Sequence, residues 1–391
     1  MSGPSNQIRF RVFGRTDVGQ VREHNEDNFL IANLTERKRS LMEADRKQVV
    51  GPSGTVLGVC DGMGGAAAGE VASQLAVDII FEKLVGGSPP LDQDDLARRL
   101  VSAVEEAGAR IFSEARADRT RRGMGTTSTI AALVDSRLFV AQVGDSRAYI
   151  LRGGELVQIS RDQSLVNQLI EAGQLTEEEA ETFEHNNIIL QALGTSETVQ
   201  VDLTYADLKR GDALLLCSDG LSGMLRSEEM RDVLLRIDDP FEACKELTDR
   251  ANAAGGHDNV TVIVARFDEG VPQLSGDEPA LQYKKYALPE ATDTEATVRA
   301  PNVDLSDAPI SDEAQRESRR LRVGHTMVGA DYSEIARRAV AQGTPPAAPP
   351  AFFGDDDPVE IPTTGLPPAT VGFMVLGAML AVAVMGFFLL R

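Results

Sequence analysis

The fold is decided by one stretch, VLGVCDGMGG at residues 56–65, in which an apolar run passes into a glycine-rich turn. The run predicts a short buried strand, because it is apolar without interruption. It ends at Asp61, and the following glycines can adopt positive φ and let the backbone approach a ligand closely. The Asp61 carboxylate beside the Gly62 carbonyl offers the hard oxygen ligands that suit Mg²⁺ or Mn²⁺. The turn alone is equally typical of an ordinary strand end, so the interpretation needs support from elsewhere in the chain.

The same arrangement, an acidic residue at the edge of an apolar strand, recurs along the chain. It occurs at Glu26-Asp27 before residues 29–31, at Asp145 after residues 138–143, at Asp219 after residues 214–217, and at Asp258 before residues 260–267. The edges of one sheet or sandwich can bring such residues together. Carboxylates that share a pocket raise one another's pKa unless cations neutralise them. The recurrence therefore predicts a multi-metal site with oxygen ligands, and five unrelated surface turns are the alternative.

The pattern of apolar residues predicts a mixed fold with antiparallel strands. Residues 69–85 and 96–115 each place apolar side chains on one helical face. Strands are expected at 128–134 and 138–143, joined by a short turn, and Gly153-Gly154 is typical of a hairpin. Hairpin-linked strands and paired helices predict an antiparallel α+β sandwich rather than a parallel sheet.

Composition excludes some classes of partner. The chain has 391 residues and a formal net charge of −21, which argues against a nucleic-acid partner, because such binding relies on Lys and Arg. Three cysteines and a polar amino terminus do not indicate a disulfide framework or a secretory signal.

The last part of the sequence differs from the rest. Residues 371–390 form an uncharged apolar run, long enough to cross about 30 Å of hydrocarbon as a helix. Only Arg391 follows, so we expect a single-pass tail anchor in the cell (inner) membrane, with the catalytic domain in the cytoplasm. Residues 268–370 are proline-rich in part and predict a mostly disordered linker.

Residues 8–267 resemble the metal-dependent serine/threonine protein phosphatases of the type-2C class, and the bacterial members look most similar. The resemblance is carried by motifs in the family's order: Arg22…Glu26-Asp27, Asp61-Gly62-Met63-Gly64-Gly65, Gly123-Met124-Gly125-Thr126-Thr127, Gly144-Asp145-Ser146-Arg147, Ser218-Asp219-Gly220 and Asp258-Asn259-Val260-Thr261. It implies two antiparallel sheets packed as a sandwich, with helices on both outer sides. Residues 160–191 are similar to the family's flap, which lies beside the active site and affects substrate choice.

The resemblance also implies a binuclear Mg²⁺ or Mn²⁺ centre. Asp61 would bridge the two ions. Asp219 and Asp258 would complete the protein ligands of one ion, whereas Glu26 and the Gly62 carbonyl would serve the other. Few protein ligands per ion leave room for water, as Mg²⁺ prefers.

Further roles follow from the same resemblance. Some bacterial members hold a third, weaker ion, here expected at Asp145 and Asp219. Asp27 would orient metal-bound water, and Arg22 has a planar fork that suits two phosphate oxygens. The implied reaction is direct attack of a metal-bridging water on phosphorus, without a phosphoenzyme.

The implied function is hydrolysis of phosphoserine and phosphothreonine in cytoplasmic proteins, opposing a serine/threonine kinase. A membrane-bound kinase is a natural partner, since tethering raises local concentration. One difference from the family's motifs supports an alternative function. Family members often carry a histidine in or just after the D-G-x-x-G turn, where this chain has Met63 and Ala66. His24 and His257 are nearby in sequence but are interpreted as solvated loop residues. The alternative is therefore a catalytically weak module that binds phosphoproteins.

Overall fold

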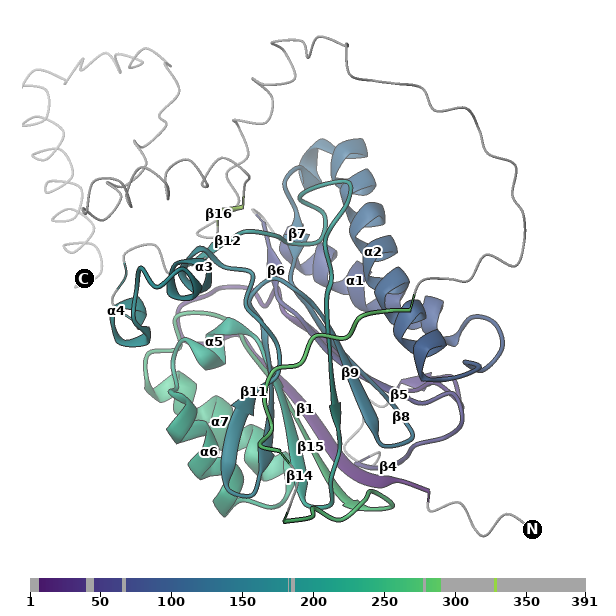
Figure 1. Cartoon of the computed structure of the whole chain (residues 1–391). Helices are drawn as coiled ribbons and strands as arrows, with labels where there is room; N and C mark the ends of the chain where they lie inside the picture. Colours follow the sequence, from purple (N-terminus) through teal and green to yellow (C-terminus); the bar gives the residue numbers. More distant parts are fainter. Residues whose placement is uncertain are drawn as a thin grey trace, which may run out of the picture. The chain divides into compact units, whose positions relative to one another are not determined.

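The computed structural model describes residues 7–39, 46–64, 68–181, 183, 187–276, 279–289 and 327–328 (Figure 1). The chain divides into two units, 1–331 and 332–391, and all described residues belong to the first. In this described part, no helix is long and apolar enough to span a membrane. The predicted anchor at 371–390 lies outside it, as does most of the predicted linker.

Two six-stranded antiparallel sheets form the centre of the described unit, as predicted. The first sheet has the order β11 (Glu155–Gln158), β10 (Arg147–Arg152), β14 (Asp212–Cys217), β15 (Val260–Glu269), β1 (Arg9–Asp17) and β4 (Lys47–Val49). The second has the order β13 (Asp202–Asp207), β9 (Arg137–Val143), β8 (Ser128–Val134), β5 (Thr55–Cys60), β2 (Asn28–Asn33) and β3 (Lys38–Arg39).

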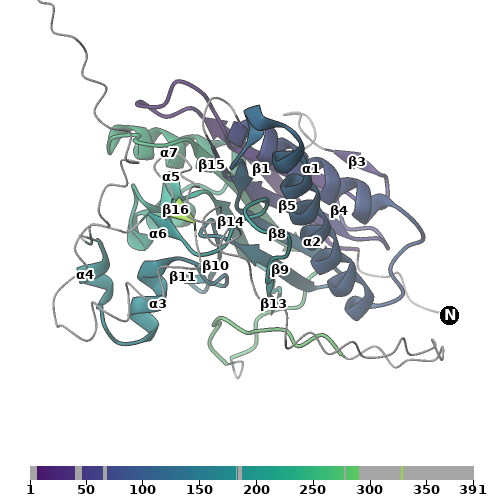
Figure 2. The same ribbon diagram turned by 90° about the horizontal axis from the view of Figure 1, so that it is seen from above.

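Helices cover the outer faces of both sheets (Figure 2). The second sheet is covered by α1 (Ala68–Val85) and α2 (Gln93–Ala117). The first is covered by α5 (Asp219–Ser222), α6 (Ser227–Arg236) and α7 (Pro240–Ala253). Two further short helices, α3 (Leu165–Glu171) and α4 (Glu177–Glu181), lie in the flap. The α+β sandwich implied by the family resemblance is therefore confirmed.

Strand β5 shows why the opening apolar run has no polar interruption. Leu57 and Val59 pack between the two sheets. Val56 and Cys60 point the other way and pack under α1 and α2. Because successive side chains of a strand alternate between faces, a strand buried on both faces must be apolar throughout. The run therefore predicts a central strand, and it delivers Asp61 to the rim of the sandwich.

The helix predicted at 96–115 begins earlier in the structure. The Asp92 side chain accepts a hydrogen bond from the Asp95 backbone N–H at 2.8 Å, and α2 therefore begins at Gln93. This is the usual way in which an acidic N-cap satisfies a free N–H of the first turn. The first turn of α2 is polar and lies outside the apolar periodicity, so the predicted helix began a few residues too late.

Short paired segments surround the rim where β5 ends. Strand β6 (Gly62–Met63) pairs with β7 (Gly125–Thr126) in antiparallel orientation, and Thr126 also bridges to Leu193. Strand β12 (Ile188–Ile189), at the end of the flap, pairs in parallel with β16 (Met327–Val328). The glycine-rich turn is thus held between α1 and the chain that leaves the flap.

Residues 279–289, here called the strap, lie along the outer edge of β13 (Figure 1). The Tyr205 N–H donates to the Lys284 carbonyl at 3.1 Å, and the Tyr286 N–H donates to the Leu203 carbonyl at 2.7 Å. The Tyr286 ring meets the rings of Phe139 and Tyr205 edge-on, with centroids 4.9 and 5.3 Å away. The first part of the predicted linker therefore belongs to the folded unit, and it covers an edge that would otherwise expose unpaired backbone groups.

The strap's contribution can be tested by Tyr286→Ala, which removes both ring contacts. We expect a loss of about 1–3 kcal/mol in the free energy of unfolding, typical of a partly buried aromatic side chain. Urea unfolding followed by circular dichroism measures it. Tyr286→Phe is the matched control, because it keeps the ring and loses only the hydroxyl contact with Asp94. Equal stability of Tyr286→Ala and the parent chain would contradict the packing described.

Candidate metal centre and active site

The backbone of Asp61 is clamped by two threonines of the GMGTT motif. The Asp61 N–H donates to the Thr127 hydroxyl at 2.9 Å. The Asp61 carbonyl accepts from the Thr127 N–H at 2.8 Å and from the Thr126 hydroxyl at 2.9 Å. The Thr127 hydroxyl also lies 2.7 Å from that of Ser146, next to Asp145. The sequence marked this motif but assigned it no role, and the structure shows that it holds Asp61 in place.

The predicted carboxylates converge around Asp61. Burial raises the pKa of Asp61 well above its ordinary value, and the negative charges of four other residues add to the rise. These residues are Asp27, Asp219, Asp258 and Asp145. Residues separated by almost two hundred positions thus act on one another, because the starts of β2 and β15 and the ends of β5, β9 and β14 meet at one rim.

Asp219 lies directly after β14, as the first residue of α5. Burial raises its pKa, and the charge of Asp258 adds to the rise. Two effects lower the pKa of Asp219 without cancelling this rise: the Asp61 side chain as a hydrogen-bond partner, and the positive charge of Arg22.

Asp27, the residue before β2, is almost fully buried. Its Oδ2 accepts a hydrogen bond from the Ser218 hydroxyl at 2.7 Å. Burial raises the pKa of Asp27 to about 7, and the charges of neighbouring carboxylates add to the rise. Hydrogen bonds with Thr261 and Ser218 oppose it. Ser218 was part of a quoted motif, but sequence reasoning gave it no function.

Glu26 and Gly62 meet at the beginning of α1. A Cβ on Gly62 would lie 2.3 Å from the carbonyl oxygens of Glu26 and Gly69, so only glycine fits there. The Glu26 carboxylate lies against Gly69 in the first turn of α1 and accepts its N–H. Burial raises the pKa of Glu26, whereas the charge of Arg22 and the Gly69 N–H oppose the rise. The positive end of the helix thus helps to hold this carboxylate.

Arg22 is paired with a predicted metal ligand. Its Nη2 donates to Asp258 Oδ2 at 2.6 Å, and both side chains remain about one-third exposed. Burial lowers the pKa of Arg22, but the charge of Asp258, the hydrogen bond to it and the charges of Asp61 and Asp219 together outweigh burial, so the pKa is raised.

Asn259 joins the two loops that carry these groups. Its Oδ1 accepts the Glu26 N–H at 2.8 Å, and its Nδ2 donates to the carbonyls of Val18 and His24 at 2.9 Å each. A buried amide can satisfy several backbone groups at once, which an aliphatic side chain cannot. Asn259 was quoted as part of the motif, yet only the structure reveals this function.

Asp145 lies in the loop after β9, and its neighbour Gly144 is hydrogen-bonded to Gln163 at the beginning of the flap. Burial and the charges of Asp219 and Asp162 raise its pKa, and the charge of Arg147 opposes the rise. Arg147 forms an ion pair with Asp162 at 2.8 Å, in which the Asp162 side chain is buried. The beginning of the flap is thus tied to β10 beside Asp145.

The two candidate histidines lie at the surface. His24 contributes its carbonyl to Asn259, and the ring of His257 lies against Gly255. Both side chains are exposed, as expected for solvated loop residues. Met63 packs with Ile189 and Ala192 in a small buried cluster, so this position of the turn is apolar. Ala66 lies outside the described residues.

The donor set fits hard divalent cations. Among the described residues, no group of three or more His, Cys, Asp or Glu side chains is placed so that it could hold a metal ion. However, Oδ1 of Asp27, of Asp145 and of Asp219 are each buried without a hydrogen-bond partner. Unpartnered buried carboxylate oxygens are costly unless a cation or water satisfies them. Mg²⁺ typically uses one or two carboxylates and keeps several waters, so an incomplete cage of oxygens is what it requires.

Comparisons with known proteins agree with this geometry. The family model described as protein phosphatase 2C matches residues 35–257. The serine/threonine phosphatase stp of Listeria welshimeri is 36% identical over 250 residues, which cover 64% of this chain and 93% of that protein. The structure of the Mycobacterium tuberculosis serine/threonine phosphatase PstP/Ppp is 35% identical, with a TM-score of 0.57, over 66% of this chain and 99% of that one.

A further solved structure bears on the metals. The catalytic domain of the serine/threonine protein phosphatase PstP, in complex with 2 manganese ions, is 34% identical with a TM-score of 0.56. The match covers 67% of this chain and 99% of that chain. A sandwich of this kind with a carboxylate-lined rim defines a class of metal-dependent phosphatases. The chain belongs to the protein phosphatase 2C family. The expected bacterial type-2C serine/threonine phosphatase is therefore confirmed.

The raised pKa values predict how the stability of the metal-free protein depends on pH. A carboxyl group whose pKa is higher in the folded than in the unfolded state stabilises the fold fully below its unfolded pKa. That contribution is lost as the pH rises through the folded pKa. For Asp27 the loss extends from about pH 4, its ordinary value, to the folded value of about 7.

We therefore expect the melting temperature in EDTA to fall by several degrees between about pH 5 and about pH 8. Mn²⁺ neutralises the carboxylates, so it should raise the melting temperature more at the higher pH. Differential scanning calorimetry at constant ionic strength measures both effects. A metal-free melting temperature that rises over this interval would show that the carboxylates are not crowded as described.

Proposed function

We propose that this chain removes phosphate from phosphoserine and phosphothreonine in cytoplasmic proteins, with two Mg²⁺ or Mn²⁺ ions at the carboxylate rim. The observation that carries the proposal is that Asp27, Asp145, Asp219 and Asp258 all lie close enough to Asp61 for their charges to raise its pKa. So many crowded carboxylates are difficult to explain in a protein that uses them only for structure, because each raises the cost of ionising the others.

We assign the ligands as the sequence predicted. Asp61 would be shared by two ions, with Asp219 and Asp258 on one side and Glu26 and the Gly62 carbonyl on the other. When bound, the ions would supply Lewis acidity and positive charge for displacement at phosphorus.

Asp145, with Asp219, is the candidate position for a third ion. Asp27 holds a hydrogen bond from Ser218, and its Oδ1 has no described partner. We therefore assign Asp27 to orienting water within the site.

Arg22 is proposed to bind the phosphoryl group. One of its N–H groups is used by Asp258, and the side chain is about one-third exposed. A guanidinium has five N–H donors in a planar fork, so others remain for phosphate oxygens. Asp258 would hold the fork in position while phosphate binds.

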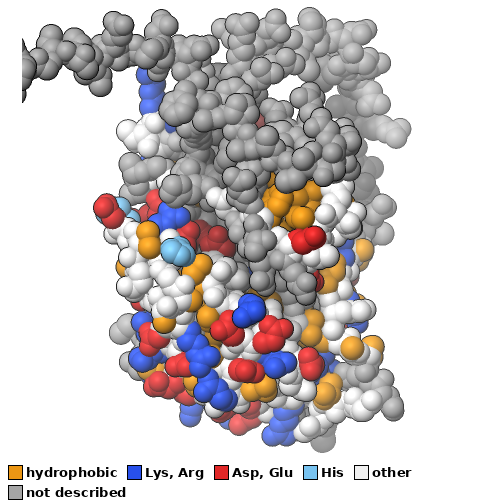
Figure 3. All heavy atoms as spheres, turned by 90° about the vertical axis from the view of Figure 1, so that its left-hand side faces the viewer, with side chains coloured by type: hydrophobic (Ala, Val, Ile, Leu, Met, Phe, Trp, Pro, Cys, Tyr) orange, Lys and Arg blue, Asp and Glu red, His pale blue; other side chains and the backbone are white. Residues whose placement is uncertain are grey.

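The cellular setting is also a proposal. We infer a catalytic domain at 8–267 in the cytoplasm, a linker at 268–370 that is mostly disordered beyond the strap, and a tail anchor at 371–390 in the cell (inner) membrane. The uncharged apolar run supports the anchor. A membrane-bound serine/threonine kinase that shares substrates with this chain is the proposed counterpart. On the face drawn in Figure 3, basic side chains of the described residues are interspersed with acidic ones, which does not favour nucleic acid.

A second candidate is a catalytically weak module that binds phosphoproteins. The apolar setting of Met63 favours it, because a general acid at this place is typically worth about 10²–10⁴-fold in rate. Turnover of a phosphothreonine peptide in Mn²⁺, compared with EDTA, distinguishes the two candidates. Binding of the peptide without turnover in Mn²⁺ would favour the second.

The ligand assignment is tested by Asp219→Asn. We expect metal-dependent hydrolysis of p-nitrophenyl phosphate to fall by more than about a hundredfold, because an amide cannot neutralise the ion's charge. Asp232→Asn is the control, since Asp232 is an exposed residue of α6. Circular dichroism verifies that both variants are folded. Full activity of a folded Asp219→Asn protein would refute the assignment.

The proposed anchor is tested by deleting residues 371–390. Because a long apolar helix partitions into lipid, the full chain should sediment with membranes and the shortened chain should not. Cell fractionation followed by immunoblotting measures this, with p-nitrophenyl phosphate hydrolysis as the control for folding. If the two chains distribute alike, the anchor is elsewhere or absent.

A further inference from the structure

Gly144, the residue before Asp145, is held by two glutamine side chains. Gln142 lies in β9 and is fully buried, and its Nε2 donates to the Gly144 carbonyl at 3.1 Å. Gln163 reaches the same residue from the flap, and its Oε1 accepts the Gly144 N–H at 3.0 Å. An amide side chain carries both donors and an acceptor, so two of them can hold both polar groups of one backbone residue. Gln142 and Gln163 are here called the glutamine pair.

The turn at Gly144 requires glycine. Its φ is +100°, in the region that favours glycine over other residues. A Cβ at this position would also lie 2.7 Å from the side chain of Thr127. Thr127 in turn accepts the Asp61 N–H with its hydroxyl. The turn that leads to Asp145 is thus packed against the residue that positions Asp61.

Gln142 also holds the backbone on the other side of Asp145. Its Nε2 donates to the Ser146 carbonyl at 2.6 Å, in addition to the Gly144 carbonyl. The Thr129 hydroxyl lies 2.8 Å from Gln142 Oε1 and 2.9 Å from the Ser146 carbonyl oxygen. Because the amide NH₂ group has two N–H donors, one buried side chain can hold the residues on both sides of Asp145.

The Asp145 carboxylate, in contrast, has an oxygen without support. Asp145 is 9% exposed, and its Oδ1 has no hydrogen-bond partner among the described residues. Since no hydrogen bond fixes this oxygen, its direction depends on the backbone that carries it. The glutamine pair holds that backbone at Gly144 and, through Gln142, at Ser146.

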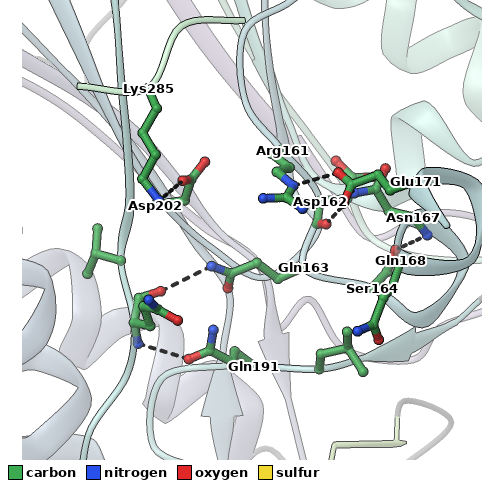
Figure 4. A pocket seen from close by; sticks show the side chains of 13 residues that line it. Arg161, Asp162, Gln163, Ser164, Asn167, Gln168, Glu171, Gln191, Asp202 and Lys285 are labelled. Atoms are coloured by element: carbon green, nitrogen blue, oxygen red, sulfur yellow. Dashed lines mark hydrogen bonds and ion pairs between the residues drawn. The ribbon is translucent and has the colours of Figure 1, made fainter. Parts of the chain in front are cut away.

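Gln163 extends this support to the flap (Figure 4). Its backbone N–H donates to the Gly144 carbonyl at 2.8 Å, and its own carbonyl accepts the Leu190 N–H at 2.7 Å. Its Nε2 donates at 3.1 Å to the Gln200 carbonyl, in the wall of the flap cavity. This name is given to the polar cavity of about 330 Å³ that the flap lines together with Lys285 of the strap. Gln163 thus joins the beginning and the end of the flap to the turn at Gly144.

We propose that the glutamine pair positions Asp145 for the third ion, which the proposed function assigns to Asp145 and Asp219. The inference rests on that function and concerns one of its ligands. Both glutamines act through the backbone beside Asp145, so they are positioning residues rather than ligands. Both are uncharged, so they set the direction of the carboxylate without changing the charge of the site. Groups that orient a metal ligand in this way typically change metal affinity by about 10-fold to 100-fold.

The experiment measures Mn²⁺ binding to the full chain, from the electron paramagnetic resonance signal of free Mn²⁺. A salt concentration of about 0.15 M screens adventitious binding to the acidic surface. Asp145→Asn identifies the third ion, because this variant loses a ligand of that ion alone. The test variant is Gln163→Met, which keeps the length of a partly exposed side chain and removes its amide. The matched control is Gln168→Met, the same change at an exposed position of α3.

We expect Gln163→Met to raise the Kd of the third ion about tenfold and to leave the two tighter ions unaffected. Gln168→Met should bind all three ions as the parent chain does. Gln142→Met removes donors on both sides of Asp145 and should weaken the third ion at least as much. Circular dichroism verifies the folding of each variant, and Gln163→Met decides the question if the buried Gln142→Met change prevents folding.

Two results would overturn the proposal. One is an equal Kd of the third ion in Gln163→Met and Gln168→Met, which would show that the amide has no part in positioning Asp145. The other is an equal weakening of all three ions in Gln163→Met, which would indicate a general loosening of the rim rather than an effect on one ligand.

Failure of the proposed function gives a different result. A parent chain that binds no Mn²⁺ and does not hydrolyse p-nitrophenyl phosphate would refute the proposed function and this inference together. A parent chain that hydrolyses p-nitrophenyl phosphate but binds only two ions, with Asp145→Asn binding the same two, would overturn this inference alone.

Discussion

The mutual repulsion of buried carboxylates is the constraint on which the rest of the structure depends. Asp61 lies among four other aspartates, and each makes ionisation of the others more costly. A fold can hold such a group only if strong packing elsewhere offsets the cost or if cations neutralise it. The two sheets and their helices provide packing around a rim where threonine and asparagine side chains hold the backbone that carries the carboxylates.

The residues around the rim show how the backbone is held without using the unpartnered carboxylate oxygens. Thr126 and Thr127 hold the backbone of Asp61, and Asn259 holds the backbone that precedes Glu26 and Asp27. Three buried carboxylate oxygens at the rim, Oδ1 of Asp27, of Asp145 and of Asp219, have no described partner and are left for ligands. A site built in this way is ordered before it binds metal, which lowers the entropy cost of assembling it.

Much of the fold could be predicted, because alternation and length are local signals. The uninterrupted run of β5 indicated a strand buried on both faces, and the hairpin glycines indicated antiparallel pairing. The start of α2 was missed, since its first turn is polar and depends on the Asp92 cap. The strap was missed for a different reason. Tyr286 packs on Phe139 and Tyr205, which lie far away in sequence, and a segment flanked by linker-like composition carries no periodicity of its own.

The sequence by itself determined which residue types stand at the strand ends, and hence that hard oxygen ligands would be available at the rim. Their spacing along the chain also indicated the family. Only the tertiary structure decided which groups touch: that Arg22 pairs with Asp258, that Ser218 supports Asp27, and that Lys285 reaches the flap cavity. The physical reason is that a strand's pattern specifies its faces but not its neighbours. Pairwise contacts arise only when both sheets and the strap have packed together.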